Sequence, residues 1–150
     1  MRKLFFIILL FQITGFVFGQ NTANLTVSIS NIELDSSKVF VGLYNSQISF
    51  KQKARAIDSL IIIPTNENTK VQFNNIPTGY YAIAVFQDTN NNGEIDLGKL
   101  KIPTEPVGIS NYSFGKSKLP PTFKKAQFTF SGDTTILITM VNNKVTTNPK

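Results

Sequence analysis

The residues with the clearest chemical potential stand in one short run, from Asp88 to Asp96. Oxygen-bearing side chains fall at relative positions one, three, five and nine of this run, and Gly93 holds position six, where a calcium loop turns sharply. A hard cation needs such a convergence of oxygens, to which residue 94 can add its backbone carbonyl. The sequence therefore predicts a calcium loop with the ligands Asp88, Asn90, Asn92, Glu94 and Asp96.

This pattern departs from a complete calcium loop in two ways. An EF-hand supplies a bidentate Glu at position twelve, where this chain has Lys99, and the two Asn ligands lower the negative charge. The expected affinity therefore falls in the weak extracellular range of roughly 0.1–1 mM. The favoured alternative is a plain hairpin, because Asn92-Gly93 between two β-like runs is a favoured two-residue turn.

A second group of candidates lies between Leu97 and Thr122, where strand periodicity stops and four prolines and three glycines occur. The segment is too apolar for a disordered linker, so we expect one long ordered loop. Long loops in compact domains are often functional. This predicts a ligand surface formed by Glu105, Asn111, Tyr112, Ser113 and Phe114. The alternative is that these side chains cap an open end of the fold.

The composition excludes the common catalytic constellations. The 150 residues include no His and no Cys, so there is no Ser-His-Asp triad, no thiolate nucleophile and no ordinary zinc site. The enzyme class left open is a small hydrolase that uses two carboxylates, drawn from Asp88, Asp96 and Glu105. We expect no enzyme, and no cofactor other than Ca²⁺.

The N-terminus has the pattern of a secretory signal. Arg2 and Lys3 precede an apolar stretch that runs to Phe18, which predicts a cleaved signal peptide at 1–19 and a periplasmic or secreted protein. The stretch is shorter than the roughly 20 residues that span a bilayer. Cleavage leaves 13 basic and 9 acidic residues, a net charge of +4. We expect neither a membrane span after cleavage nor a nucleic-acid partner.

Period-two alternation of apolar residues predicts about seven short strands. The runs lie at 25–30, 39–44, 60–63, 71–73, 80–86, 126–131 and 136–141. The runs 39–44 and 80–86 are apolar on both faces, as in strands that are buried on both sides. The last two runs flank Gly132-Asp133 and are predicted to form a hairpin, while 49–58 is a short helix or a loop. The expected fold is all-β, an antiparallel β-sandwich in one domain over 20–142, with a polar tail at 143–150.

Several motifs together resemble the domain of unknown function 2141 family. They are 79–88, then Asn90, Asn92-Gly93 and Asp96, then 108–111, then 120–123 with Ala126 and Phe128. The resemblance implies an exported bacterial protein with an immunoglobulin-like or transthyretin-like sandwich, and it implies no activity. Members commonly carry a His where this chain has Gln87 and a Phe where it has Ile109. No His-dependent role can therefore be carried over.

These features favour a non-enzymatic exported module for binding or adhesion at the cell envelope. We expect a monomer whose partner is an envelope protein or a glycan. One alternative is the carboxylate-dependent hydrolase. The other is a structural subunit of an envelope complex, in which a partner strand adds to an open sheet edge.

Overall fold

The computed structural model describes residues 21–52, 55–98, 102–114 and 120–142. The predicted signal peptide at 1–19 and the predicted tail at 143–150 lie outside these residues, as does Lys99. In the described ranges, no helix is both long enough and apolar enough to cross a membrane.

The described residues form eight strands and two short helices. In chain order they are β1 (Thr22–Ser30), β2 (Lys38–Tyr44), α1 (Gln47–Gln52), β3 (Asp58–Ile62), β4 (Thr69–Pro77), β5 (Gly79–Asp88), β6 (Val107–Ile109), α2 (Phe123–Ala126), β7 (Phe128–Phe130) and β8 (Thr134–Thr139). Each predicted run of alternation overlaps a strand. The segment at 49–58 contributes the end of α1 and the start of β3, and the predicted long loop contains the short strand β6.

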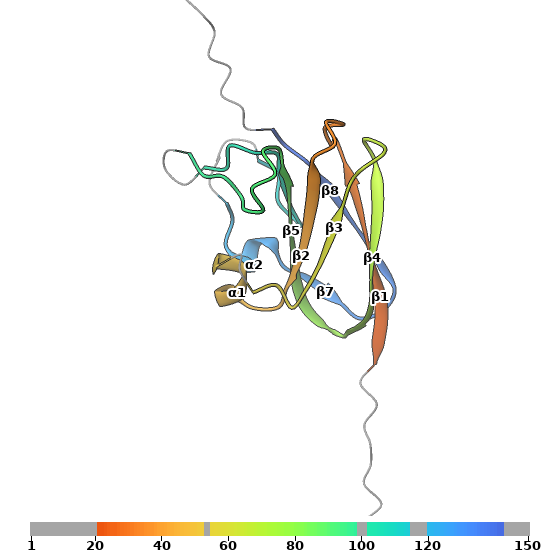
Figure 1. Cartoon of the computed structure of the whole chain (residues 1–150). Helices are drawn as coiled ribbons and strands as arrows, with labels where there is room; N and C mark the ends of the chain where they lie inside the picture. The colour runs from red at the N-terminus through yellow and green to blue at the C-terminus, as the bar shows by residue number, and fades with distance from the viewer. Residues whose placement is uncertain (1–20, 53–54, 99–101, 115–119, 143–150) are drawn as a thin grey trace, which may run out of the picture.

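The strands form two facing sheets (Figure 1). One sheet has the order β4-β1-β8, and the other has the order β3-β2-β5-β6, with β7 paired to β5. The predicted all-β sandwich is confirmed. The run 80–86 lies in the strand with the most partners, because β5 pairs with β2, β6 and β7.

The strand pairing differs from the expected pattern in one direction and in one partner. β1 and β8 run parallel, with Val27 opposite Ile136. The predicted hairpin between the last two runs is wrong, because β7 pairs with β5 while β8 pairs with β1. The chain crosses between the sheets at 131–133, where the Asp133 carboxylate accepts a hydrogen bond of 2.8 Å from the backbone N–H of Asn24. Strands β7 and β8 therefore fill the core from opposite sheets.

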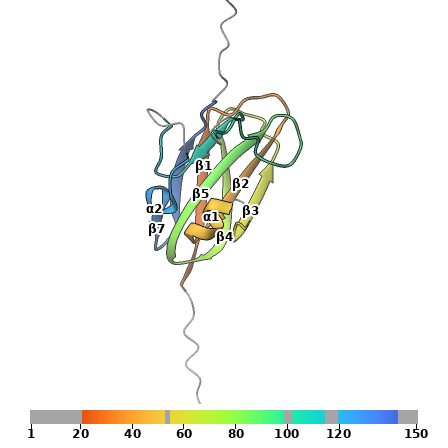
Figure 2. The ribbon, with the colours of Figure 1, turned by 90° about the vertical axis from the view of Figure 1, so that its left-hand side faces the viewer.

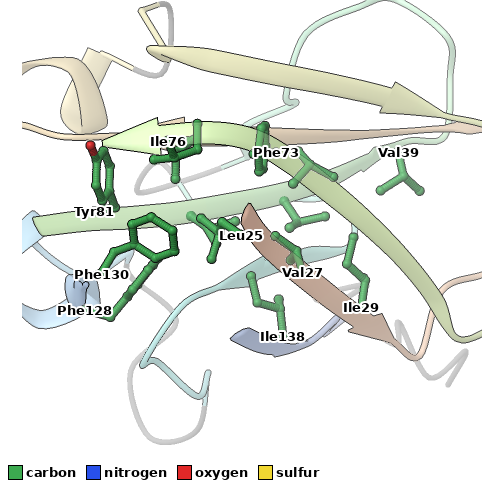
Figure 3. Close-up of a cluster of buried hydrophobic side chains, with 14 of the residues drawn as sticks. Leu25, Val27, Ile29, Val39, Phe73, Ile76, Tyr81, Phe128, Phe130 and Ile138 are labelled. Atoms are coloured by element: carbon green, nitrogen blue, oxygen red, sulfur yellow. The ribbon is translucent and has the colours of Figure 1, made fainter. Parts of the chain in front are cut away.

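Alternate side chains of both sheets fill the space between them (Figure 3). Tyr81 of β5 and Phe130 of β7 meet edge to face, with 6.1 Å between ring centroids. The Tyr81 hydroxyl donates a hydrogen bond of 2.9 Å to the Pro77 carbonyl, so this buried polar group has a partner. Burial of one large apolar side chain contributes roughly 1.5–3 kcal/mol. This core therefore holds together a chain that has no disulfide.

The outer faces of the two sheets differ in polarity. On β1 the outward residues are polar: Thr26, Ser28 and Ser30. On β2 and β5 the outward residues are apolar or small, and helices α1 and α2 cover part of them (Figure 2). This covered part is a second buried cluster, formed by Tyr44, Phe50, Ala82, Ile109, Phe123 and Ala126.

Gly108 provides a test of how closely the two sheets approach each other. A Cβ at Gly108 would lie 2.5 Å from Ile138 Cγ2 and 3.2 Å from the Met140 sulfur, so Gly108→Ala should overpack the core. We expect the free energy of unfolding to fall by about 1–3 kcal/mol, measured by urea denaturation. Gly132→Ala is the matched control, because no heavy atom lies within 4 Å of the added Cβ. Equal losses in the two variants would contradict this packing.

Candidate functional site

The acidic loop, residues 88–96, folds around the carboxylate of Asp88. This side chain is 1% exposed, and its two oxygens accept hydrogen bonds from the backbone N–H groups of Asn92 (3.0 Å) and Gly93 (2.8 Å). Gly93 has a φ of +81°, a conformation that favours glycine. The Asn92-Gly93 pair does not sit in a two-residue hairpin, because β5 pairs with β6, which begins at Val107.

The other predicted calcium ligands gather beside Asp88. The side-chain nitrogens of Asn90 and Asn92 lie 2.6 and 3.1 Å from the two carboxylate oxygens of Asp96. The side-chain oxygen of Asn92 accepts the Glu94 backbone N–H at 2.8 Å. No group of three or more His, Cys, Asp or Glu side chains suited to a metal occurs in the described ranges. The loop offers a cation two carboxylates and two side-chain amides.

Glu105 lies inside the connection between β5 and β6 and not at a ligand surface. It is 3% exposed, and its two oxygens accept the backbone N–H groups of Thr89 (2.8 Å) and Asp96 (3.1 Å). The carboxylates of Asp88 and Glu105 thus hold the acidic loop at its start, its turn and its end. Of the three carboxylates from which a two-carboxylate hydrolase would draw its pair, Asp88 and Glu105 are engaged by backbone amides, and Asp96 is engaged by the side-chain amides of Asn90 and Asn92.

Gln87 fixes the base of the acidic loop from the other side of β5. It is fully buried, and its amide nitrogen donates to the Glu33 carbonyl (2.6 Å), the Ser37 hydroxyl (2.8 Å) and the Asp35 carboxylate (3.0 Å). Burial raises the pKa of Asp35, but hydrogen bonds from Ser37 and Gln87 outweigh it and leave this pKa below 3.8. The sequence identified Gln87 as a departure from the family pattern and gave no sign of this structural role.

The other four residues of the predicted ligand surface have different surroundings. The Asn111 side-chain nitrogen donates to the Gln127 carbonyl at 2.8 Å, and Asn111 and Ser113 are exposed. The rings of Tyr112 and Phe114 meet edge to face, 5.1 Å apart, and pack against the second buried cluster. Of the five predicted residues, Phe114 lines the groove described next.

A groove of about 560 Å³ crosses the outer face of the β3-β2-β5-β6 sheet. This volume falls within the usual range of small-molecule sites. Strand register sets a row of small and apolar residues side by side along its floor: Ser59, Gly42, Ala84 and Ile109. Beside this row, Phe40 and Phe86 are stacked, with ring centroids 4.7 Å apart and planes 7° apart. Both phenylalanines are half-buried.

The groove is walled at one end by the connection between β5 and β6 and at the other by the segments around the helices. Figure 2 shows this connection and the two helices toward opposite ends of the sheet. The first wall is formed by Gly93, Glu94, Ile95 and Pro103, and the second by Gln52, Ala56, Phe114 and Pro120. The Tyr44 ring also lines the groove and lies over Gly42, where an added Cβ would be 2.8 Å from the Tyr44 hydroxyl oxygen. Burial raises the pKa of the Tyr44 hydroxyl above its ordinary value.

This groove was not predicted from the sequence, although the residue pattern that produces it is present there. Residues 39–44 and 80–86 are apolar on both faces, and we interpreted both faces as buried. The outward positions of these runs alternate large and small, with Phe40, Gly42 and Tyr44 on β2 facing Phe86, Ala84 and Ala82 on β5. Small residues between aromatic ones leave a hollow that the helices do not fill.

A family model covers most of the strands just described. It matches residues 27–137, well over half of the chain, and its family is described as an uncharacterized protein conserved in bacteria. No curated protein and no solved structure matches the chain. The match confirms the resemblance predicted from the motifs of β5, the acidic loop and the later segments. The chain belongs to the domain of unknown function 2141 family (DUF2141).

Proposed function

We propose that this chain is an exported, non-enzymatic binding module of the bacterial envelope, and that it holds its ligand in the groove on the β3-β2-β5-β6 sheet. The observation that carries this proposal is the apolar outer face that the described residues leave partly uncovered. Outward residues of a two-layer sandwich are ordinarily polar, as they are on β1. The stacked pair Phe40 and Phe86 instead borders open space.

The groove is preorganised, which favours binding over a passive structural role. Its floor is set by the ladders of β2 with β3 and β5 and of β5 with β6. One wall is fixed by the carboxylates of Asp88 and Glu105. The other is fixed where α1 meets α2, with the rings of Phe50 and Phe123 6.0 Å apart. A ligand therefore meets a rigid surface and loses little free energy to ordering it.

Export and the envelope setting rest on the predicted signal peptide at 1–19 and on the family resemblance. In that setting the ligand is part of an envelope protein, part of a glycan, or a small molecule that passes through the envelope. The mechanism is presentation by a rigid scaffold, in which strands hold the segments that carry the contact residues.

Filling the groove tests the binding function. Ala84→Phe places a ring over the floor, so we expect it to weaken binding of the uncharged apolar dye N-phenyl-1-naphthylamine at least about tenfold, about 1.4 kcal/mol. The readout is a fluorescence titration of the folded protein. Thr135→Phe adds the same ring to the outer face of the other sheet, where Thr135 is exposed, and should bind as the parent chain does. Unchanged binding by Ala84→Phe would place the dye elsewhere.

Calcium binding by the acidic loop is the second part of the proposal. With a dissociation constant of roughly 0.1–1 mM, about 10 mM calcium should stabilise the fold by about 1.4–2.7 kcal/mol. A thermal melt should therefore shift upward by several degrees when calcium follows EDTA, and Asp88→Asn should abolish this shift. Glu94→Gln is the control, since residue 94 would contribute its backbone carbonyl. A melt that does not respond to calcium removes the metal from this function.

A further inference from the structure

Basic side chains gather at one end of the groove. The end that carries the helices has the exposed basic residues Lys51, Arg55, Lys124 and Lys125. Residues 47–57 and 120–127 contain no Asp or Glu. The opposite wall carries Glu94, and Asp96 follows it in the acidic loop. The outer face near this wall also carries the exposed Lys38, which pairs with Asp88 in the register of β2 and β5, so the charge there is mixed, whereas the described residues of the helix segments carry basic charge alone.

The basic residues of the two helices belong to one site because the helices are joined. The backbone N–H of Phe123 donates to the Gln47 side-chain oxygen at 3.1 Å. Lys51 and Arg55 each precede a residue that lines the groove, Gln52 and Ala56. Figures 1 and 2 show α1 and α2 at the same end of this face.

We infer that the groove binds a small amphiphile with one anionic head group, which lies at the helix end while its apolar body covers the floor toward Phe40 and Phe86. This inference rests on the proposed binding function and adds the chemical class of the ligand. The basic residues attract the anionic head group to the helix end, which sets the direction in which the ligand lies.

The size and lining of the groove favour this class over a sugar or a macromolecule. Its polar side chains are few: Ser59, Gln52, Tyr44 and Glu94 among eighteen lining residues. A glycan would need many more hydrogen-bond partners than these. Walls at both ends and a volume of about 560 Å³ suit a free small molecule better than a membrane surface or a protein helix.

Ligands with one chain length and different head groups test the inference. Decanoate, decyltrimethylammonium and decanol compete with N-phenyl-1-naphthylamine for the parent protein, each below its micellar concentration. Decanoate should displace the dye at about tenfold lower concentration than decyltrimethylammonium does, with decanol between them. The preference should shrink as salt is raised, because the attracting charges are exposed.

Paired charge variants locate the effect. Arg55→Gln with Lys124→Gln should remove most of the preference for decanoate and leave displacement by decanol unchanged. Lys70→Gln is the control for the loss of one charge, because Lys70 is exposed and lies on β4 in the other sheet. If Lys70→Gln lowers the preference as much as Arg55→Gln alone does, the attraction comes from net charge and the inference is wrong.

The remaining outcomes distinguish a failure of this inference from a failure of the proposed binding function. Equal displacement by all three head groups would overturn the anionic ligand and leave the apolar groove as a binding site. No binding of the dye or of any decyl compound would overturn the proposed function itself. Sedimentation with anionic vesicles that persists in Ala84→Phe would assign the basic residues to a membrane surface and would also overturn the inference.

Discussion

The pairing of β2 with β5 is the constraint on which the rest of this structure depends. Both strands carry apolar side chains on both faces, and their register sets Val41 against Val85 on one face and Phe40 against Phe86 on the other. The inner face packs against the opposite sheet, and the two sheets together form the sandwich. The outer face needs a second cover, because apolar surface is costly to leave in water. Helices α1 and α2 supply that cover at one end, and the part that no described residue covers is the groove.

Polar groups set the wall at the other end. The connection after β5 is long, and two carboxylates with almost no exposure hold it by bonding to its backbone amides. Gln87 ties the start of the connection to the segment before β2. Buried polar groups that are fully hydrogen-bonded specify one geometry, because any slip leaves them without partners. The acidic loop is therefore a rigid rim for the groove, whether or not it also holds a cation.

Local patterning predicted the strands well, because period-two alternation directly reports one buried face. It failed where two arrangements share one pattern. The Gly132-Asp133 turn fits a hairpin and a crossing between sheets equally, and the long-range pairing of β1 with β8 decides between them. In the same way, apolar residues on both faces of β2 and β5 do not reveal how much of the second face is covered. The convergence of Asp88, Asn90, Asn92 and Asp96 was predictable from spacing within nine residues, whereas the burial of Glu105 depends on contacts with Thr89, sixteen positions away.

The most direct measurement of whether the groove is the functional surface is a map of backbone amide chemical shifts during titration with decanoate. The largest changes should fall on Gly42, Ala84 and the residues around Phe40 and Phe86, with the polar outer face at Thr26 and Thr135 unaffected. Changes concentrated on the β4-β1-β8 sheet would contradict the assignment of function to this face. Changes at the outer edge of β3 with none at the groove residues would contradict it as well.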